Sequence, residues 1–297
     1  MDYAHFLARR IDGKVQKLAV DAGLTCPNRD GTLGWGGCTY CDNRAFSPSY
    51  CHRTQSVTQQ LEAGKRFFAG KYPDMRYLAY FQAYTATHAA FERQRQLYDE
   101  ALAVDGVVGL VIATRPDCVG DDLLAYLQEV DRSRMVIVEL GVETMHDRTL
   151  RLVNRCHNWA TSQACIERVA QMGLTVGAHL ILGLPGESVD DMVATVDAVS
   201  QLPVSLVKFH QLQVLRGTTL ARQVERGEVE VRDWTAEHYA ELCVRLVAHL
   251  RHDIVVERWV AQAPPHMVIT PRWGLKPAEF QRLLSSLAPN ESQIKFK

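Results

Sequence analysis

Three cysteines in one loop are the residues of this sequence best suited to chemistry. Cys26, Cys38 and Cys41 are separated by eleven and by two residues, within a 25–51 segment rich in Gly, Asn, Asp, Ser and Pro. That composition does not continue a helix or a strand, and a loop of this length usually has a function. Thiolates are soft ligands that favour iron–sulfur clusters and zinc. The spacing therefore predicts a metal centre.

Two other interpretations of this loop have to be weighed. The cysteines could be unrelated thiols in a surface loop, which a lone CxxC pair would permit. The loop could also hold zinc, because Cys51 or His52 would complete a four-ligand tetrahedral site. The loop alone leaves the choice between zinc and an iron–sulfur cluster open.

Composition excludes several functional classes. The chain has 297 residues, with 33 basic and 34 acidic side chains and a net charge of −1, so no global field would attract nucleic acid or an anionic membrane. Nucleic acid remains possible as a partner through a local basic patch. No apolar run reaches the length of a membrane span, and the first residues carry no apolar signal segment. We expect a soluble, cytoplasmic protein whose other cysteines are reduced thiols: Cys118, Cys156, Cys165 and Cys243.

The elements around the loop alternate between short apolar runs and longer amphipathic segments. This alternation predicts βα units and a parallel sheet, either curved into a barrel or open. We place a boundary near Gly217, after which the chain becomes partly Pro-rich and irregular. The predicted strands are 14–20, 76–82, 106–114, 135–143, 175–183, 206–215 and 253–260, and the predicted helices are 55–70, 91–104, 121–131, 161–172 and 233–251.

Loops at the carboxyl ends of parallel strands carry the chemistry of such folds. The cysteine loop follows the first predicted strand, so it should lie at this end. The fifth strand runs into a turn with Gly183 and Pro185, followed by a capping-box pattern at Ser188 and Asp191. Glycine at this turn would let a flat ligand approach the backbone.

Side-chain parity selects the polar groups that face the interior of the barrel. The outer face of each strand should be apolar because helices cover it, so polar residues at strand ends should face inward. A lone buried histidine is more often a satisfied core residue, but convergence of several polar groups favours a site. The inward-facing polar groups are Gln82 with Tyr84, Glu139 with Glu143, His179, and Lys208 with His210.

These motifs together resemble the radical S-adenosylmethionine (radical SAM) enzymes, and most closely their YhcC-like family, whose core is similar to the catalytic subunit of Elongator. The resemblance covers about residues 3–276 and rests on the segments CPNRDGT…GGCTYC, YFQAYTATHA, IATRPDC, VELGVETMHDRTL, HLILGLPGES, VKFHQLQVLRGT and ITPRW. It implies an α/β fold with a partial TIM-type (β/α)6 barrel at 1–216 and a C-terminal helical and irregular extension at 217–297.

The resemblance also implies two cofactors and their ligands. Cys26, Cys38 and Cys41 would hold a 4Fe-4S cluster that leaves one iron open to S-adenosylmethionine, whose reductive cleavage gives a 5′-deoxyadenosyl radical. Tyr40 would pack beside the adenine, and the 82–85 segment, with Gln82 and Tyr84, would lie near the methionine amino group, although QAYT differs from the common GGE-like sequence.

The remaining expectations concern the nucleoside and the substrate. Glu139 and Glu143 would accept bonds from the ribose, and Gly183 and Pro185 would border the nucleoside. Glu143 replaces a glutamine common in the family.

Lys208, His210 and His179 would form the catalytic, substrate-facing side. The substrate is unidentified, a one-electron reductant protein is an expected partner, and the alternatives are an RNA-modifying radical SAM enzyme and a zinc-stabilised binding module.

Overall fold

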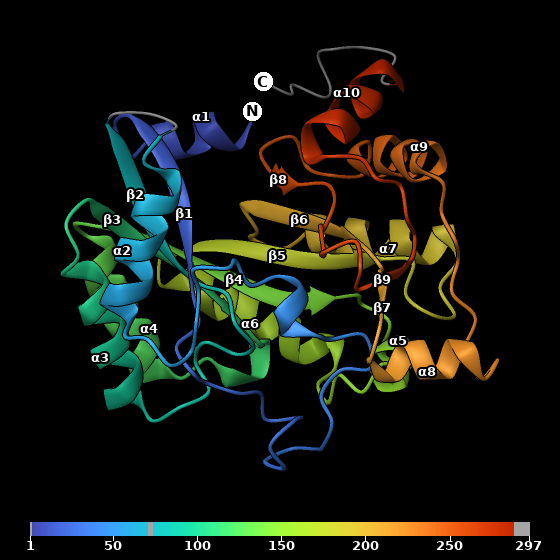
Figure 1. Cartoon of the computed structure of the whole chain (residues 1–297), viewed down its shortest axis with the longest axis horizontal. Coiled ribbons are helices and arrows are strands. Elements are labelled where there is room, and N and C mark those ends of the chain that lie inside the picture. The colour runs from blue at the N-terminus through green and yellow to red at the C-terminus, as the bar shows by residue number, and fades with distance from the viewer. Residues whose placement is uncertain (1, 71–73, 288–297) are drawn as a thin grey trace.

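The structure is a computed structural model that describes residues 2–70 and 74–287. Seven parallel strands form one sheet in the order β1-β2-β3-β4-β5-β6-β8, and the sheet curls into a half-barrel (Figure 1). The strands are β1 (Lys14–Val20), β2 (Met75–Phe81), β3 (Val107–Thr114), β4 (Met135–Glu143), β5 (Thr175–Leu182), β6 (Leu206–Gln211) and β8 (Val255–Arg258). The predicted α/β partial barrel is confirmed.

Helices follow the strands and cover the outer face of the sheet. Their apolar sides pack on outward strand residues such as Leu18, Val138 and Phe209, so parity assigned the outer face correctly. The helices of the barrel are α2 (Val57–Phe68), α3 (Phe91–Leu102), α4 (Asp121–Asp131), α5 (Asp147–Leu152), α6 (Trp159–Gln171) and α7 (Val189–Ser200), with short 3-10 turns at Asn43–Ala45 and Pro116–Cys118. Ser188 and Asp191 form the expected capping box at the start of α7.

The amino-terminal end of the barrel is closed by α1 (Tyr3–Ala8). Leu7 of this helix and Ile11 pack against inward-facing strand residues, including Leu78 and Ile137. Because apolar side chains fill this end, a polar cavity can form only at the opposite end, where the strands reach their carboxyl termini.

The segment after residue 217 contributes directly to the barrel. Its strand β8 pairs in parallel with β6, so the sheet has a strand beyond the six βα units that the resemblance implied. The remaining elements are α8 (Thr219–Glu225), α9 (Ala236–Val247), α10 (Pro277–Leu287) and an antiparallel pair, β7 (Val214–Leu215) with β9 (Val268–Thr270). The boundary near Gly217 stays a prediction.

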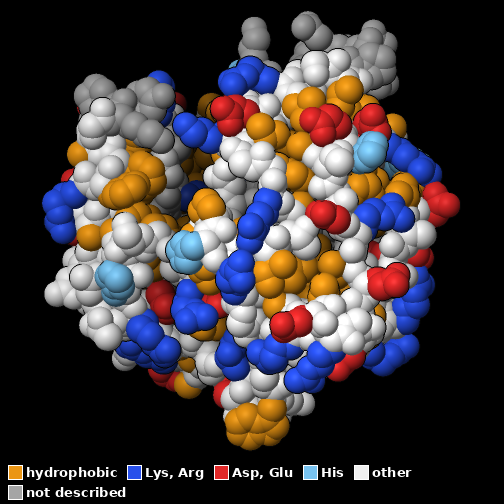
Figure 2. Space-filling view, turned by 45° about the vertical axis from the view of Figure 1, so that its right-hand side comes forward, with side chains coloured by type: hydrophobic (Ala, Val, Ile, Leu, Met, Phe, Trp, Pro, Cys, Tyr) orange, Lys and Arg blue, Asp and Glu red, His pale blue; other side chains and the backbone are white. Residues whose placement is uncertain are grey.

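The surface agrees with the near-zero net charge. Figure 2 shows basic and acidic side chains interspersed over one face of the molecule. Within the described ranges, no helix is both long and apolar enough to cross a bilayer.

Candidate active site

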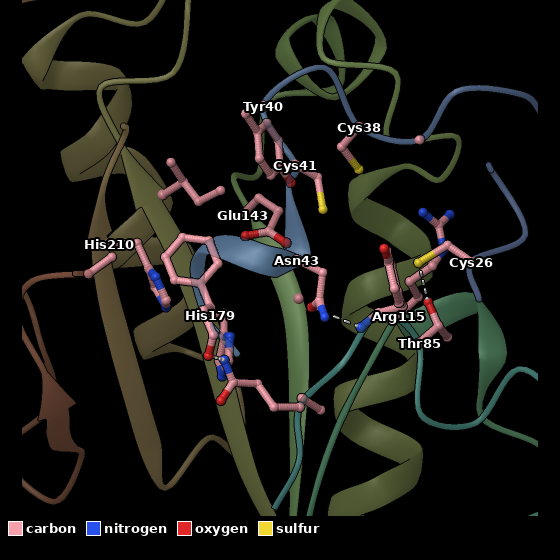
Figure 3. Close-up of a pocket in the computed structure, with 18 of the residues that line it drawn as sticks. Cys26, Cys38, Tyr40, Cys41, Asn43, Thr85, Arg115, Glu143, His179 and His210 are labelled. Atoms are coloured by element: carbon pink, nitrogen blue, oxygen red, sulfur yellow. Dashed lines mark hydrogen bonds between the residues drawn. The ribbon is translucent and has the colours of Figure 1, made fainter. Parts of the chain in front are cut away.

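One cavity at the carboxyl ends of the strands collects most of the chemically active side chains. Cys26, Cys38 and Cys41 line it together with His179 and His210. Figure 3 shows Cys26 on one side of this cavity, the two histidines on the other, and Cys41 between them. Local sequence therefore produces a loop after β1 that projects its thiols over the mouth of the barrel.

The cysteine loop is held by its own backbone and by polar side chains that contact sulfur. Asn28 Nδ2 donates to Cys38 Sγ over 3.3 Å and to the carbonyl of Asn154 over 2.8 Å. The Thr85 hydroxyl donates to Cys26 Sγ over 3.0 Å. Donors of this kind stabilise thiolates, so the surroundings suit ligation by sulfur.

Gly31 is needed for the compact shape of this loop. Its φ is +94°, and a Cβ atom there would lie 2.4 Å from the Trp35 ring. The positive φ favours glycine here, and an added Cβ atom would displace the exposed ring of Trp35.

Cys51 lies apart from the other three loop cysteines. It is buried outside the cavity lining, and its thiol donates to Gln60 Oε1 over 3.1 Å. His52 is exposed and does not line the cavity either. In the part of the chain that the structure describes, no group of three or more His, Cys, Asp or Glu is arranged to hold a single metal ion. The geometry offers three thiols without the fourth ligand that a tetrahedral zinc site needs.

Arginines balance the thiols electrostatically. Burial raises the pKa of Cys41 to about 12, and the positive charges of Arg29 and Arg155 act in the opposite direction. Burial also raises the pKa of Cys26, against the Thr85 hydrogen bond and the charge of Arg155. The thiols of Cys26 and Cys41 are therefore protonated until a metal or cluster replaces the protons.

Five of the residues expected to bind the nucleoside cofactor line this cavity: Tyr40, Gln82, Tyr84, Glu139 and Glu143. Tyr84 and Glu143 have positive φ values of 55° and 68°, which side-chain-bearing residues rarely adopt. Such strain at a cavity is typical of functional positions. Glu143 Oε1 lies 3.2 Å from Arg155 Nη2, and the Tyr40 hydroxyl is buried without a partner.

Gly183 and Pro185 do not border the cavity. They line a separate surface pocket with Trp234. A Cβ atom on Gly183 would lie 2.8 Å from the Trp234 Nε1 atom, and its φ is +88°. The glycine that sequence analysis assigned to a flat ligand instead accommodates an indole of the C-terminal segment.

Glu139 reaches the cavity, but its carboxylate is already paired. Oε1 accepts from Lys17 and Lys208, each over 2.7 Å, and Oε2 accepts from Lys208 over 2.6 Å. His179 Nε2 lies 2.8 Å from Oε2. Burial favours a raised pKa for Glu139, but the two lysine charges outweigh it and hold the pKa well below its usual value. Instead of a free ribose acceptor, the structure shows the centre of a buried ion cluster.

Lys208, expected to face the substrate, is instead buried beneath the cavity and does not line it. Its ammonium also contacts Glu257 Oε1 at 3.0 Å and the Tyr80 hydroxyl at 3.2 Å. Burial lowers the pKa of Lys208 to about 8, against the raising effect of Glu139 and Glu257, so the ammonium is mostly charged at neutral pH. Two carboxylates saturate this cation.

His179 and His210 do face the cavity, and their ring centroids are 5.3 Å apart. Burial lowers the pKa of His179, and the bond to Glu139 offsets only part of this effect. Burial and then the charge of Arg258 hold the pKa of His210 well below its usual value. Both rings are therefore neutral at physiological pH.

Several polar residues of the cavity lining were not selected from the sequence, among them Asn28, Arg115, Arg155 and Arg258. Arg115 is 1% exposed, pairs with Asp117 Oδ2 over 2.7 Å through Nη2, and leaves its buried Nη1 without a partner. Arg115 follows the last residue of β3, so the rule that selected polar residues at the other strand ends would also have selected it.

Comparison with known proteins identifies the family to which this geometry belongs. The model of the radical SAM superfamily matches residues 26–199, and that of the radical SAM C-terminal domain matches residues 204–288. The chain belongs to the radical SAM superfamily. The matched range begins at Cys26, the first cysteine of the loop.

Within the superfamily, this radical SAM protein is a homologue of YhcC and YtqA. It is 37% identical to protein YhcC of Escherichia coli (strain K12) over 271 residues, which are 90% of this chain and 85% of that protein. It is also 37% identical to YtqA of Bacillus subtilis (strain 168) over 271 residues, 91% of this chain and 84% of that protein. The predicted family is confirmed.

A solved structure supports the fold of this radical SAM protein independently. The Elp3 protein of the archaeon Methanocaldococcus infernus, in a form lacking residues 1–46, matches with a TM-score of 0.69 at 17% identity. The match covers 93% of this chain and 63% of that one. At this identity the likeness shows the shared fold.

Proposed function

We propose that this protein is a radical SAM enzyme in which Cys26, Cys38 and Cys41 hold a 4Fe-4S cluster that cleaves S-adenosylmethionine reductively. The observation that carries the proposal is the placement of three thiols at one cavity, with Cys51 paired elsewhere. Three thiolates for four irons would leave one iron open for S-adenosylmethionine.

The residues around the thiols fit both groups. Asn28 and Thr85 donate to sulfur, and Arg29 and Arg155 offset the negative charge of a thiolate-ligated cluster. Arg115 has an unpartnered buried Nη1 at the cavity, which suits the carboxylate of the methionine moiety. When bound, the cluster supplies one electron that cleaves the sulfonium to methionine and a 5′-deoxyadenosyl radical.

The protein's own part is to orient the nucleoside and exclude water. Tyr40 and Tyr84 supply aromatic walls, and Gln82 is positioned by donating to the Phe46 carbonyl over 3.2 Å. Side chains that surround the nucleoside and displace water would shield a reactive radical from side reactions. The reductant protein, the cytoplasmic location and any nucleic-acid partner remain predictions.

The test is spectroscopic. After anaerobic reconstitution with iron and sulfide, the reduced protein should show the electron paramagnetic resonance signal of a 4Fe-4S cluster, and S-adenosylmethionine should shift that signal by binding the open iron. Arg115→Gln should keep the signal and require at least about tenfold more S-adenosylmethionine for the shift, in line with the loss of a charged hydrogen bond. Stoichiometric zinc with no iron signal would refute the proposal and favour the binding-module alternative.

A further inference from the structure

We propose that Arg258, beside His210, forms a subsite that binds an oxyanion of the substrate, a carboxylate or a phosphate, on the side of the cavity opposite Cys26. The inference rests on the proposed function, because it assigns the space left beyond the nucleoside to the substrate. Arg258, which was not selected from the sequence, would thus take the substrate-facing role that was expected for Lys208.

A bulge in β8 brings Arg258 to the cavity. Val207 pairs with Val256 and Lys208 pairs with Arg258, so Glu257 is an extra residue on β8. A bulge places two consecutive side chains on one face of a strand. Glu257 consequently turns toward Lys17 and Lys208, while Arg258 reaches the cavity lining.

The guanidinium of Arg258 lacks a carboxylate partner. Among residues 2–70 and 74–287, no acidic side chain forms an ion pair with it, and its Nε is buried without a hydrogen-bond partner. Its Nη2 lies 3.1 Å from Nε2 and 3.3 Å from Nδ1 of His210. Nearly equal distances to both ring nitrogens are incompatible with a linear bond to one lone pair, so this contact satisfies the guanidinium poorly.

The charges around Arg258 also leave its guanidinium without a counterion. The cluster beneath the cavity holds the cations Lys17 and Lys208 and the carboxylates Glu139 and Glu257, which neutralise each other. His179 and His210 are neutral, so Arg258 adds a positive charge without a counterion. A half-buried charge without a counterion favours an anion or polar ligand, and a guanidinium binds carboxylate and phosphate through two parallel bonds.

The position of the subsite separates it from the cofactor. Figure 3 shows His210 on the opposite side of the cavity from Cys26 and Thr85, with Tyr40 and Glu143 between them. A substrate bound at Arg258 would therefore extend across the cavity toward the nucleoside. Its reactive carbon would lie between Arg258 and the nucleoside.

The test is calorimetric titration of the reconstituted protein with inorganic phosphate and with acetate, at constant ionic strength. The wild-type protein should bind at least one of them saturably, and Arg258→Gln should weaken that binding at least tenfold. Phosphate alone would indicate a phosphorylated substrate, and acetate alone a carboxylate. The control is Arg132→Gln, at the end of α4, where the arginine pairs with Glu129 on the surface, and it should bind as the wild type does.

Two results would overturn the subsite: no binding of either anion by the wild-type protein, or equal binding by Arg258→Gln. The first result would mean that Arg258 is neutralised within the protein, for which the unpartnered Glu257 Oε2 is the available group. The second would mean that the anion binds at another cation of the cavity, such as Arg115. A marked fall in the melting temperature of anion-free Arg258→Gln would also contradict the subsite, because removing an unpaired charge should not destabilise the fold. These titrations need no radical chemistry, so failure of the cluster assay and failure of the subsite are distinguishable.

Discussion

At the scale of single residues, the cysteines of the loop divide into three that line the cavity and one that is buried in the core. Cys26, Cys38 and Cys41 line the cavity, whereas Cys51 is buried against Gln60. Local sequence selected the three cavity cysteines because their spacing and the glycines around them are visible within one loop; their role as cluster ligands stays a prediction. The fate of Cys51 depends on a helix that follows it, so the loop alone could not decide it.

The cysteine substitutions should separate these two roles. Cys38→Ala should abolish iron binding and the brown colour of the reconstituted protein, because the cluster loses one of three ligands. Cys51→Ala should retain both and lower the free energy of unfolding by about 1 kcal/mol, the value of a typical hydrogen bond. Iron analysis and urea unfolding check the pair, and loss of iron in Cys51→Ala would indicate a four-cysteine site.

The sequence indicated that Gly183 lies in a turn, but it did not indicate which side chain packs against it. Its positive φ is a property of the turn after β5, but the Trp234 ring that covers it comes from a distant segment. The sequence pattern therefore indicates that a glycine is needed for the turn, but it does not indicate that Trp234 packs against it.

Gly183→Ala should destabilise the protein by about 2–4 kcal/mol, from backbone strain and a close contact with Trp234. Gly186→Ala is the matched control, since its φ is +77° and nothing lies within 4 Å of the added carbon, so only the strain of about 1–2 kcal/mol remains. Thermal unfolding of both variants checks this. Equal losses would show that the indole moves aside without cost.

At the scale of elements, strand ends determine which polar groups meet. Alternation along β4, β5 and β6 predicted correctly which side chains point inward, because parity is a property of one strand. It could not predict depth or pairing: Lys208 and Glu139 saturate each other below the cavity. The bulge at Glu257, which is invisible in the sequence, decides which residue of β8 reaches the site.

The buried ion cluster makes a strong stability prediction. Glu139→Gln leaves Lys17 and Lys208 facing each other with only Glu257 to balance them, so the free energy of unfolding should fall by about 3–5 kcal/mol. Denaturant titration measures it. The control Glu129→Gln, a surface pair with Arg132, should change it by less than about 1 kcal/mol. A small change in the free energy of unfolding for Glu139→Gln would mean that water solvates the charges of Lys17 and Lys208.

At the scale of the whole molecule, the curled sheet gives the protein a filled end and an open end. The α/β barrel was predictable because seven apolar runs of strand length alternate with amphipathic segments. The run at 253–260 was recognised as strand-like, but its pairing with β6 was not foreseen, because the chain around it is Pro-rich and irregular. The C-terminal segment thus supplies Arg258 to the site and Trp234 to the turn after β5.

Burial of neutral histidines should make stability depend on pH. The folded pKa of His210 is far below its unfolded value of about 6.5, so below that pH only the unfolded chain takes up the proton. The free energy of unfolding should therefore fall as pH drops from 6.5, by up to about 1.4 kcal/mol per pH unit for this group.

Denaturant titrations between pH 7.0 and 5.5, with iron content checked at each pH, measure this slope. His210→Gln should reduce the slope and leave the contribution of His179, while the exposed His266→Gln serves as the control. An unchanged slope in His210→Gln would show that the ring is protonated in the folded protein.

The most direct measurement of the central claim is the formation of 5′-deoxyadenosine from S-adenosylmethionine by the anaerobically reconstituted protein with dithionite. The wild-type protein should release it slowly without substrate, and Cys38→Ala should release none. Absence of 5′-deoxyadenosine from a wild-type preparation that contains a full cluster, or equal release by Cys38→Ala, would contradict the assignment of this site to radical SAM chemistry.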